Sequence, residues 1–388
     1  MPSARDRHLL SPGPKRILSL DGGGIRGIVT LAFLERIEAL LRERTANPDL
    51  RLSDHFDLIG GTSTGAIIAT GLALGHSVAD MIDVYLNLAS QGFHRRWWLG
   101  GTLVPKFRAS SLLSAIHAHL GDTTLGSDRL LTGLGIFAKR LDTGSVWLFH
   151  NHPHGRFFAP TDANPDSAPN RDLPLAMLVR ASTAAPSYFE PELMEVARGV
   201  SGAFIDGGVS PHLNPALLLL MLATLEGYGF RWPVGEDRLA LVSVGTGGVA
   251  VSRPARSVLR MPAAWLAVNA LRSLMRDCDW LTQTLLQWMG QSPTLWPIDA
   301  EIGDLANDRL GPVKLLHYVR YDAMLEAEWL AGEVGLHLQP DELLALQAID
   351  RPAMAPRLLE IGRMIAAKRV RSEHFPAVFD ARAEKADA

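Results

Sequence analysis

The sequence of 388 residues predicts an α/β fold, with a mainly parallel central sheet between two layers of helices and a C-terminal helical extension. Three observations predict it. A short apolar run, a glycine turn and a helical pattern follow one another twice before residue 75, and further short apolar runs occur up to residue 244. After residue 254 the pattern becomes helical. Strands that alternate with helices form parallel sheets, because each helix returns the chain to the same end of the sheet.

The predicted elements follow in chain order. The first strand is 17–20, an apolar run between a proline and a glycine, and apolar residues at helical spacing predict a helix over 28–41. The second unit has a strand at 56–59, a glycine-rich turn and a helix over 66–74. The remaining apolar runs predict strands at 134–138, 146–149, 203–205 and 239–244.

These elements divide the chain into three parts. Residues 1–14 are expected to be a flexible N-terminus, 15–250 the domain that contains the core fold, and 251–388 a helical extension packed on that domain. The packing is expected from apolar residues that share one helix face, namely Leu271, Leu274, Met275, Cys278, Leu281 and Leu285.

Composition excludes several classes of protein. Lys and Arg number 38 against 41 Asp and Glu, a net charge of −3, which argues against a nucleic-acid polymer as partner. The single cysteine, Cys278, excludes an intramolecular disulfide and a cysteine-based zinc site, and it favours a reducing, cytoplasmic setting. The start of the chain has no apolar stretch typical of a secretory signal. The apolar run 216–223 is far shorter than the ~18 residues of a membrane span.

The first glycine turn, DGGGIRG at 21–27, lies between a predicted strand and a predicted helix. Backbone N–H groups and the helix dipole favour an anion at such a place. Gly22, Gly24 and Gly27 also match the G-x-G-x-x-G pattern of dinucleotide sites, so a nucleotide-binding module is one alternative function. That pattern requires an acidic residue at the end of a second strand about 20 positions later. Asp49 supplies the acid, but no strand precedes it.

The second turn, GTSTG at 61–65, matches the G-x-S-x-G pattern of a nucleophile elbow. A sharp turn from strand to helix holds the serine in strained backbone angles, and the residues two before and two after it must lack Cβ. Gly61 and Gly65 occupy those positions around Ser63. The alternative is a serine that only caps the helix.

Together the two turns suggest acyl transfer. The Ser63 hydroxyl would attack a carbonyl carbon, and the N–H groups of Gly23 and Gly24 would bind the oxyanion, with that of Thr64 as a third donor. Arg26 would either add positive charge for a phosphate-bearing substrate or brace the loop through a salt bridge.

The candidate base is Asp206, which follows the predicted strand 203–205 and precedes Gly207 and Gly208. Because the carboxyl ends of parallel strands meet at one edge of a sheet, its distance of 143 residues from Ser63 is no obstacle. Whether Asp206 acts directly or through a histidine stays open. The candidate histidines are His212, His317, His337 and His374.

Four segments in this order resemble the patatin-like phospholipase family: SLDGGGIRG at 19–27, FDLIGGTSTG at 56–65, ASTAAPSYF at 181–189 and DGGV at 206–209. The resemblance covers about 15–250 and implies a three-layer patatin-like fold related to cytosolic phospholipase A2. It also implies metal-free hydrolysis of lipid acyl esters without a cofactor. It assigns the nucleophile to Ser63, the base of a histidine-free dyad to Asp206, and the oxyanion hole to Gly22, Gly23 and Gly24.

The sequence departs from the family at 210–215, SPHLNP, where many bacterial relatives have a shorter run with paired asparagines. This leaves open the role of His212, which we group with Gly207 and Gly208 as residues that surround the dyad. Some bacterial relatives are effectors of anti-phage defence that cyclic nucleotides activate, so a cyclic nucleotide is an alternative partner. A general esterase or thioesterase is a further alternative, because the fold does not determine the acyl substrate.

A phospholipid substrate requires contact with a membrane. The segment 93–99 combines cations and aromatic rings, as interfacial segments do, and suggests peripheral contact at the inner membrane face through Arg95, Arg96, Trp97 and Trp98. The alternative is a loop whose tryptophans fold back into the core. The helix that carries Trp265, Trp280 and Trp288 is expected to be packed against the protein. The oligomeric state is left open.

Overall fold

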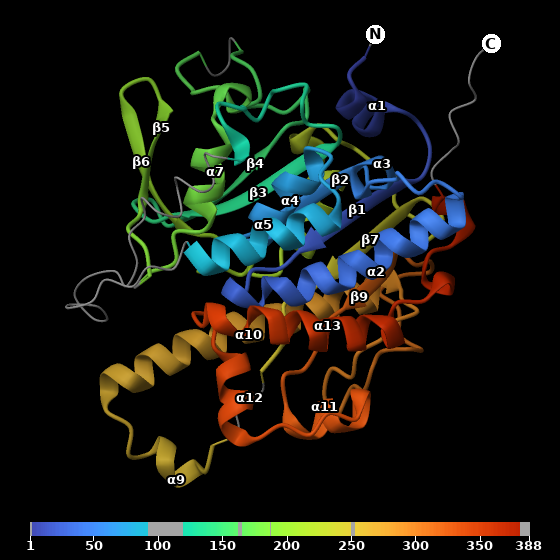
Figure 1. The fold of residues 1–388 in the computed structure, drawn as a ribbon. Helices are drawn as coiled ribbons and strands as arrows, with labels where there is room; N and C mark the ends of the chain where they lie inside the picture. The colour runs from blue at the N-terminus through green and yellow to red at the C-terminus, as the bar shows by residue number, and fades with distance from the viewer. Residues whose placement is uncertain (1, 92–118, 162–164, 187, 250–252, 381–388) are drawn as a thin grey trace.

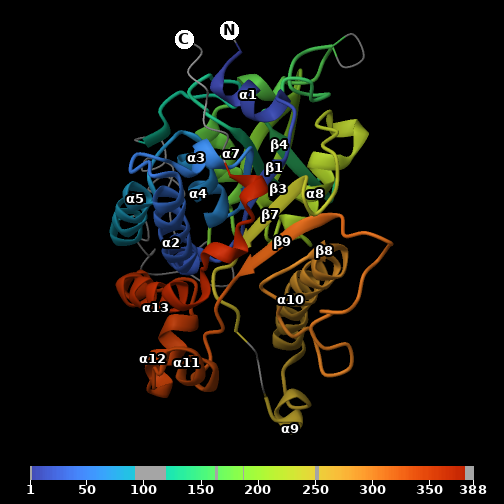
Figure 2. The same cartoon turned by 90° about the vertical axis from the view of Figure 1, so that its right-hand side faces the viewer.

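A single central sheet with helices on both faces organises the computed structural model, which describes residues 2–91, 119–161, 165–186, 188–249 and 253–380 (Figures 1 and 2). The strand order is β5-β6-β3-β2-β1-β7-β9-β8, and β4 pairs with β3. The pairs among β3, β2, β1, β7, β9 and β8 are parallel, whereas β4 and β6 are antiparallel to β3. The predicted α/β class with a mainly parallel sheet is confirmed.

The strands are β1 (Lys15–Leu20), β2 (Leu58–Thr62), β3 (Gly133–Arg140), β4 (Ser145–His150), β5 (Glu192–Ala197), β6 (Val200–Asp206), β7 (Leu239–Val244), β8 (Gly290–Gln291) and β9 (Leu316–Tyr321). The α-helices are α1 (Ala4–Leu10), α2 (Gly27–Thr45), α3 (Leu52–His55), α4 (Thr64–Ala73), α5 (Val78–Gln91), α7 (Leu175–Ser182), α8 (Ala216–Thr224), α9 (Ala255–Val258), α10 (Ala263–Met289), α11 (Ala327–Val334), α12 (Pro340–Gln347) and α13 (Ala355–Arg369).

Side chains that alternate along the strands build two cores. On β7, Leu241 belongs to the core beneath α8, and Val242 belongs to the core beneath α2, α4 and α13. The same alternation separates Tyr318 from Val319 on β9. Successive side chains of a strand point to opposite faces, so the sheet is buried on both sides. The result is the three-layer arrangement that the resemblance implied.

The C-terminal region contributes to the sheet, which the sequence did not predict. β9 lies beside β7, and β8 lies beside β9. All six residues of β9, LHYVRY, are buried. Its histidine and arginine interrupt the apolar run, and this hid the strand from a search for continuous hydrophobic segments. The helices predicted after residue 254 are present around these strands.

Two further expectations differ from the structure. Residues 1–14 include α1, capped by the Ser3 side chain, with Leu9 buried in the core beneath α8. The first half of α10 does not pack on the domain: Trp265 is 61% exposed and Leu274 57%. None of the described helices is both long and apolar enough to cross a bilayer. The predicted membrane contacts Arg95, Arg96, Trp97 and Trp98 lie outside the described residues.

Candidate active site

Ser63 lies in a tight turn between the end of β2 and the start of α4. Its backbone angles are φ 56° and ψ −121°, a conformation that residues with a side chain rarely adopt. A Cβ on Gly61 would lie 2.1 Å from the carbonyl oxygen of Gly65, and a Cβ on Gly65 would lie 2.2 Å from that of Leu20. These distances are far below van der Waals contact. They are the physical reason for glycine at both positions.

The Ser63 hydroxyl donates a hydrogen bond of 2.6 Å from Oγ to Oδ2 of Asp206. Both residues are buried, with exposed fractions of 8% and 6%. The other carboxylate oxygen, Oδ1, accepts the N–H of Gly208 at 2.7 Å. Burial raises the pKa of Asp206 to about 6, and the hydrogen bonds from Ser63 and Gly208 oppose this shift. The carboxyl is therefore a stronger base than an ordinary aspartate.

Strand register brings Asp206 to Ser63. Thr62, the last residue of β2, pairs with Phe137 of β3, and Asp206, the last residue of β6, pairs with the next residue, Ala138. Since β4 occupies the opposite edge of β3 at both positions, β2 and β6 share one edge and meet end to end. The sequence suggested that Asp206 ends a parallel strand, but β6 is antiparallel to β3. The side chains of Ser63 and Asp206 therefore meet because β2 and β6 end against consecutive residues of β3, and not because their strands are parallel.

Among the described residues, no histidine ring forms a hydrogen bond with Ser63 or Asp206. The backbone carbonyl of His212 accepts the Thr62 hydroxyl, but its ring makes no hydrogen bond to Ser63 or Asp206. The ring of His317 contacts the carbonyl of His374, whose own ring contacts the Tyr321 hydroxyl. His337 is exposed between α11 and α12. The geometry therefore brings Asp206 to Ser63 without an intervening imidazole.

The first glycine loop, 22–24, lies beside this turn. A Cβ on Gly22 would be 3.2 Å from the Cβ of Ser63. The N–H of Gly22 already donates to the carbonyl of Leu213 at 3.0 Å, and that of Gly23 donates to the Thr64 hydroxyl at 3.2 Å. Within the described part of the chain, the N–H of Gly24 has no acceptor. Of the three predicted oxyanion donors, Gly22 donates to a fixed backbone carbonyl and Gly23 to a side-chain hydroxyl that can rotate away. Gly24, and Gly23 once that hydroxyl has turned, are therefore the better candidates.

Gly24 itself has φ +59°, and a Cβ there would lie 2.5 Å from the carbonyl oxygen of Ile349. The N–H of Ile25 donates to the same carbonyl, and the Tyr85 hydroxyl donates to the carbonyl of Gly24. The absence of side chains in this loop therefore permits close contacts within the protein. The loop is held from both α5 and the segment that follows α12.

Ser182 is a site residue that sequence reasoning did not identify. It ends α7, is fully buried, and accepts the backbone N–H of Ser63 at 2.9 Å while donating to the carbonyl of Phe137 at 2.6 Å. It belongs to the third segment of the family resemblance, which was the available signal. Its hydroxyl joins the elbow to β3.

A buried charge cluster beneath the glycine loop was also missed. Arg320 of β9, 1% exposed, reaches across β7 and contacts the Ser243 hydroxyl at 2.7 Å. Its guanidinium also contacts the carboxylates of Asp21 at 2.7 Å and Asp322 at 2.6 Å, and Asp279 lies 3.9 Å away. Burial and the neighbouring carboxylates raise the pKa of Asp21, against the effect of Arg320. A residue 299 positions away therefore holds the start of the loop.

Arg26 begins the turn into α2. Its Nε is buried without a hydrogen-bond partner, and in the described ranges it forms no ion pair within 4.0 Å. Burial lowers its pKa, and the Asp322 carboxylate opposes this change. Of the two predicted roles, the salt bridge that would brace the loop is not seen, and Arg26 stays a cation near the turn.

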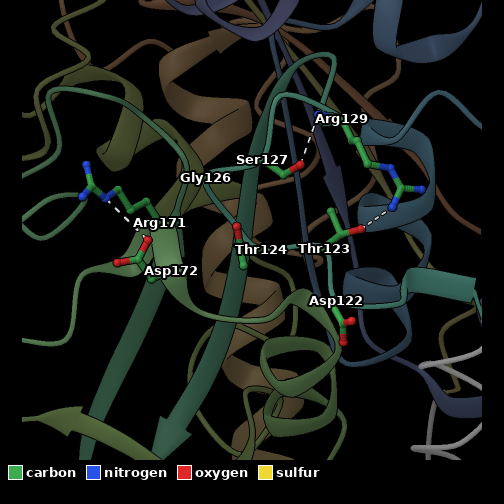
Figure 3. A pocket seen from close by; sticks show the side chains of 8 residues that line it. All are labelled: Asp122, Thr123, Thr124, Gly126, Ser127, Arg129, Arg171 and Asp172. Atoms are coloured by element: carbon green, nitrogen blue, oxygen red, sulfur yellow. Dashed lines mark hydrogen bonds and ion pairs between the residues drawn. The ribbon is translucent and has the colours of Figure 1, made fainter.

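A cavity of about 420 Å³ lies away from these residues (Figure 3). It is lined by side chains of both charges, among them Arg129, Arg171 and Asp172, and Figure 3 shows Arg129 bound to the Thr123 hydroxyl. Arg171 and Asp172 precede the start of α7, whereas Ser182 at its end contacts Ser63. This cavity is therefore separate from the Ser63 site.

Comparison with known proteins gives consistent findings. Residues 18–220 match the family model described as patatin-like phospholipase. The chain is 33% identical over 237 residues to the cGAMP-activated phospholipase of Escherichia coli (strain TW11681), covering 60% of this chain and 62% of that protein. It is 27% identical over 279 residues to Patatin-17 of Solanum cardiophyllum, covering 68% of each.

Among solved structures, human GIVD cytosolic phospholipase A2 aligns with 93% of this chain and 60% of its own, at 12% identity and a TM-score of 0.42. The match to the bacterial relative spans 62% of that protein's length, which is less than two thirds.

Proposed function

This chain belongs to the patatin-like phospholipase family, and from this membership we propose that it is a lipid acyl hydrolase of the phospholipase A type that cleaves acyl esters of membrane phospholipids. The observation that carries the proposal is the 2.6 Å hydrogen bond between Ser63 and Asp206 in a strained, buried turn. A hydroxyl that donates to a carboxylate of raised basicity is prepared for nucleophilic attack. The substrate would be reached from the cytoplasmic side of a membrane.

In the proposed first step, Ser63 Oγ attacks the ester carbonyl carbon and its proton moves to Oδ2 of Asp206. The carbonyl oxygen becomes an oxyanion, which the N–H groups of Gly23 and Gly24 and the N-terminus of α4 stabilise. The tetrahedral intermediate then breaks the ester bond. The departing alcohol takes the proton from Asp206, and the acyl group stays on Ser63.

In the second step, water attacks the acyl carbon and gives its proton to Asp206. The bond to Ser63 breaks, Ser63 Oγ recovers the proton, and the fatty acid leaves. No metal or cofactor takes part. Arg26, which closes the short helical turn after Gly23, is the cation that we assign to the phosphate of the substrate.

The rival function, a nucleotide-binding module, has less support. A dinucleotide site uses its glycines to let the backbone approach the pyrophosphate. Here Gly24 approaches the Ile349 carbonyl, and a Cβ on Gly23 would lie 2.1 Å from the Thr246 hydroxyl oxygen. The space beside Gly23 and Gly24 is therefore filled by other residues of the protein, where a dinucleotide site would need it for the pyrophosphate.

The test combines labelling with hydrolysis. We expect a fluorophosphonate to label the wild-type protein and not Ser63→Ala, and both Ser63→Ala and Asp206→Asn to lose hydrolysis of phospholipid vesicles and of a soluble ester. Because the His212 ring forms no hydrogen bond with the dyad, the hydrolysis rate of His212→Ala should be less than about tenfold below that of the wild type. Addition of a dinucleotide should leave the melting temperature unchanged.

Three outcomes would contradict the proposal: labelling that persists in Ser63→Ala, a His212→Ala variant as inactive as Ser63→Ala, or stabilisation by the dinucleotide. Hydrolysis of soluble esters or thioesters with no action on vesicles would favour the general esterase or thioesterase. Activation by a cyclic nucleotide is the alternative suggested by the bacterial relative. Activity that cyclic GMP–AMP leaves unchanged would remove its support.

A further inference from the structure

Residues 253–276, which we call the arm, contain α9 and the first half of α10. The arm extends away from the sheet in both views (Figures 1 and 2). None of its residues is buried, whereas Leu286 and Gln287 at the other end of α10 are fully buried. The arm is therefore anchored at its C-terminal end.

The arm exposes large apolar side chains at unusual density. Leu259 is 86% exposed and Trp265 61%. Single exposed apolar residues are common on soluble proteins, but a concentration of them on one element marks a surface that has a partner. On α10, small and large aliphatic residues share one face, while Arg272 and Arg276, one turn apart, lie on another face together with Trp265. The exposed large apolar residues are Val258, Leu259, Trp265, Leu266, Val268, Leu271 and Leu274.

The charge of the arm identifies the chemistry of that partner. The arm has no aspartate or glutamate, while the whole chain has a net charge of −3. Five arginines are exposed on it, and no ion pair within 4.0 Å is found for them in the described ranges: Arg253, Arg256, Arg260, Arg272 and Arg276. A second copy of the arm would bring like charges together, whereas an anionic surface would neutralise them.

Aliphatic residues, tryptophan and arginine on one amphipathic element are the composition of helices that lie in a membrane interface. We propose that the arm is a docking surface for an anionic phospholipid bilayer. An amphipathic helix of this composition lies along the surface of a bilayer.

The position of the arm relates docking to catalysis. Arg276 donates to the carbonyl of Val249, just beyond the end of β7, and Asp279 on the next turn of α10 accepts from Asn214. β7, β1 and β2 are parallel, so their ends lie at the edge that carries Ser63. Docking through the arm presents this edge to the lipid, and this part of the inference rests on the proposed function.

The test uses three exposed leucines of the arm. The variant Leu259→Glu, Leu271→Glu, Leu274→Glu is combined with Ser63→Ala for binding to vesicles of phosphatidylglycerol and phosphatidylcholine, so that the lipid is not hydrolysed. We expect affinity to fall by about tenfold or more, because binding scales with buried apolar area. Hydrolysis of a soluble ester, measured with Ser63 intact, should change by less than about twofold. Added salt, and vesicles of pure phosphatidylcholine, should both weaken binding by the Ser63→Ala protein with an intact arm.

The control is Leu193→Glu, Val313→Glu, Leu344→Glu, with three similarly exposed residues, at 69%, 66% and 63%, outside the arm. It should leave vesicle binding and ester hydrolysis unchanged. Equal vesicle binding by the Ser63→Ala protein with and without the arm substitutions overturns the proposal. So does an oligomer that the arm variant converts to a monomer with no effect on vesicle binding, which would assign the surface to a second copy. A protein that binds vesicles through the arm but hydrolyses no ester keeps the docking surface and loses the proposed function.

Discussion

At the scale of single residues, Asp206 determines the proposed chemistry. A carboxylate at the ordinary pKa of 3.8 is a weak acceptor for a serine proton, and burial raises the pKa of Asp206 to about 6. Near neutral pH the group is still mainly ionised. The same shift has a cost in stability: the unfolded chain loses this proton near pH 3.8 and the folded chain near 6, so the free energy of unfolding decreases as the pH rises between them.

This shift predicts the pH dependence of hydrolysis. Because protonated Asp206 cannot accept the Ser63 proton, kcat/KM for a soluble ester should fall on acidification with an apparent pKa of about 6 instead of 3.8. The measurement is the pH profile of the wild type beside that of His212→Ala. The profile of His212→Ala should show the same decrease on acidification. A decrease with an apparent pKa near 3.8, or one that is absent in His212→Ala, would contradict the role of Asp206.

At the scale of elements, the site depends on three segments that meet on β3. β2 and β6 end against consecutive residues of this strand, and α7 ends at Ser182, whose hydroxyl joins the Ser63 N–H to the Phe137 carbonyl. A strained turn persists only when its surroundings hold it in place. The Ser182 hydroxyl is one of the groups that hold it.

Ser182→Ala should therefore affect both stability and catalysis. It leaves a buried donor and a buried acceptor unpaired, which should lower the free energy of unfolding by about 1–3 kcal/mol and also lower kcat for a soluble ester. Urea unfolding and steady-state kinetics measure the two effects. The control is Thr70→Val, because the Thr70 hydroxyl donates only to the Ala66 carbonyl within α4. Similar losses of kcat in both variants would contradict a specific role for Ser182.

At the scale of the whole molecule, the C-terminal region is joined to the first loop through the sheet. Arg320 of β9 contacts Asp21, which directly precedes the glycine loop, and Asn214 connects α10 to the segment after Asp206 through Asp279. Residues from both ends of the chain therefore position the candidate site. Removal of the C-terminal region would remove these contacts as well as β8 and β9.

Arg320→Met tests this connection. It leaves buried carboxylates without their cation and should destabilise the protein by about 3–5 kcal/mol. In the double variant Asp21→Asn, Arg320→Met, the free energy of unfolding should fall by less than the sum of the decreases in the two single variants, because the double variant also removes one of the buried carboxylate charges. Chemical denaturation of the four proteins gives the coupling energy. Additive losses would show that Asp21 and Arg320 do not act as a pair.

Local patterns in the sequence were sufficient for much of the fold and for locating the candidate nucleophile. The strand predicted at 239–244 coincides with β7, and those at 17–20 and 134–138 lie inside β1 and β3. The G-x-S-x-G spacing located the turn at Ser63, since steric exclusion of Cβ acts within a few residues. Such features depend on neighbours along the chain, and a sequence displays those neighbours directly.

Contacts between segments that are distant in the sequence could be identified only from the tertiary structure. The register of β3 placed Asp206 beside Ser63, 143 residues away, and left His212 without a contact to either. The packing of β9 brought Arg320 to Asp21. The first half of α10, which the sequence pattern predicted to pack on the domain, is exposed and forms the arm. The physical reason is that hydrophobic spacing reports which side chains avoid water, whereas strand pairing and packing decide which of them meet.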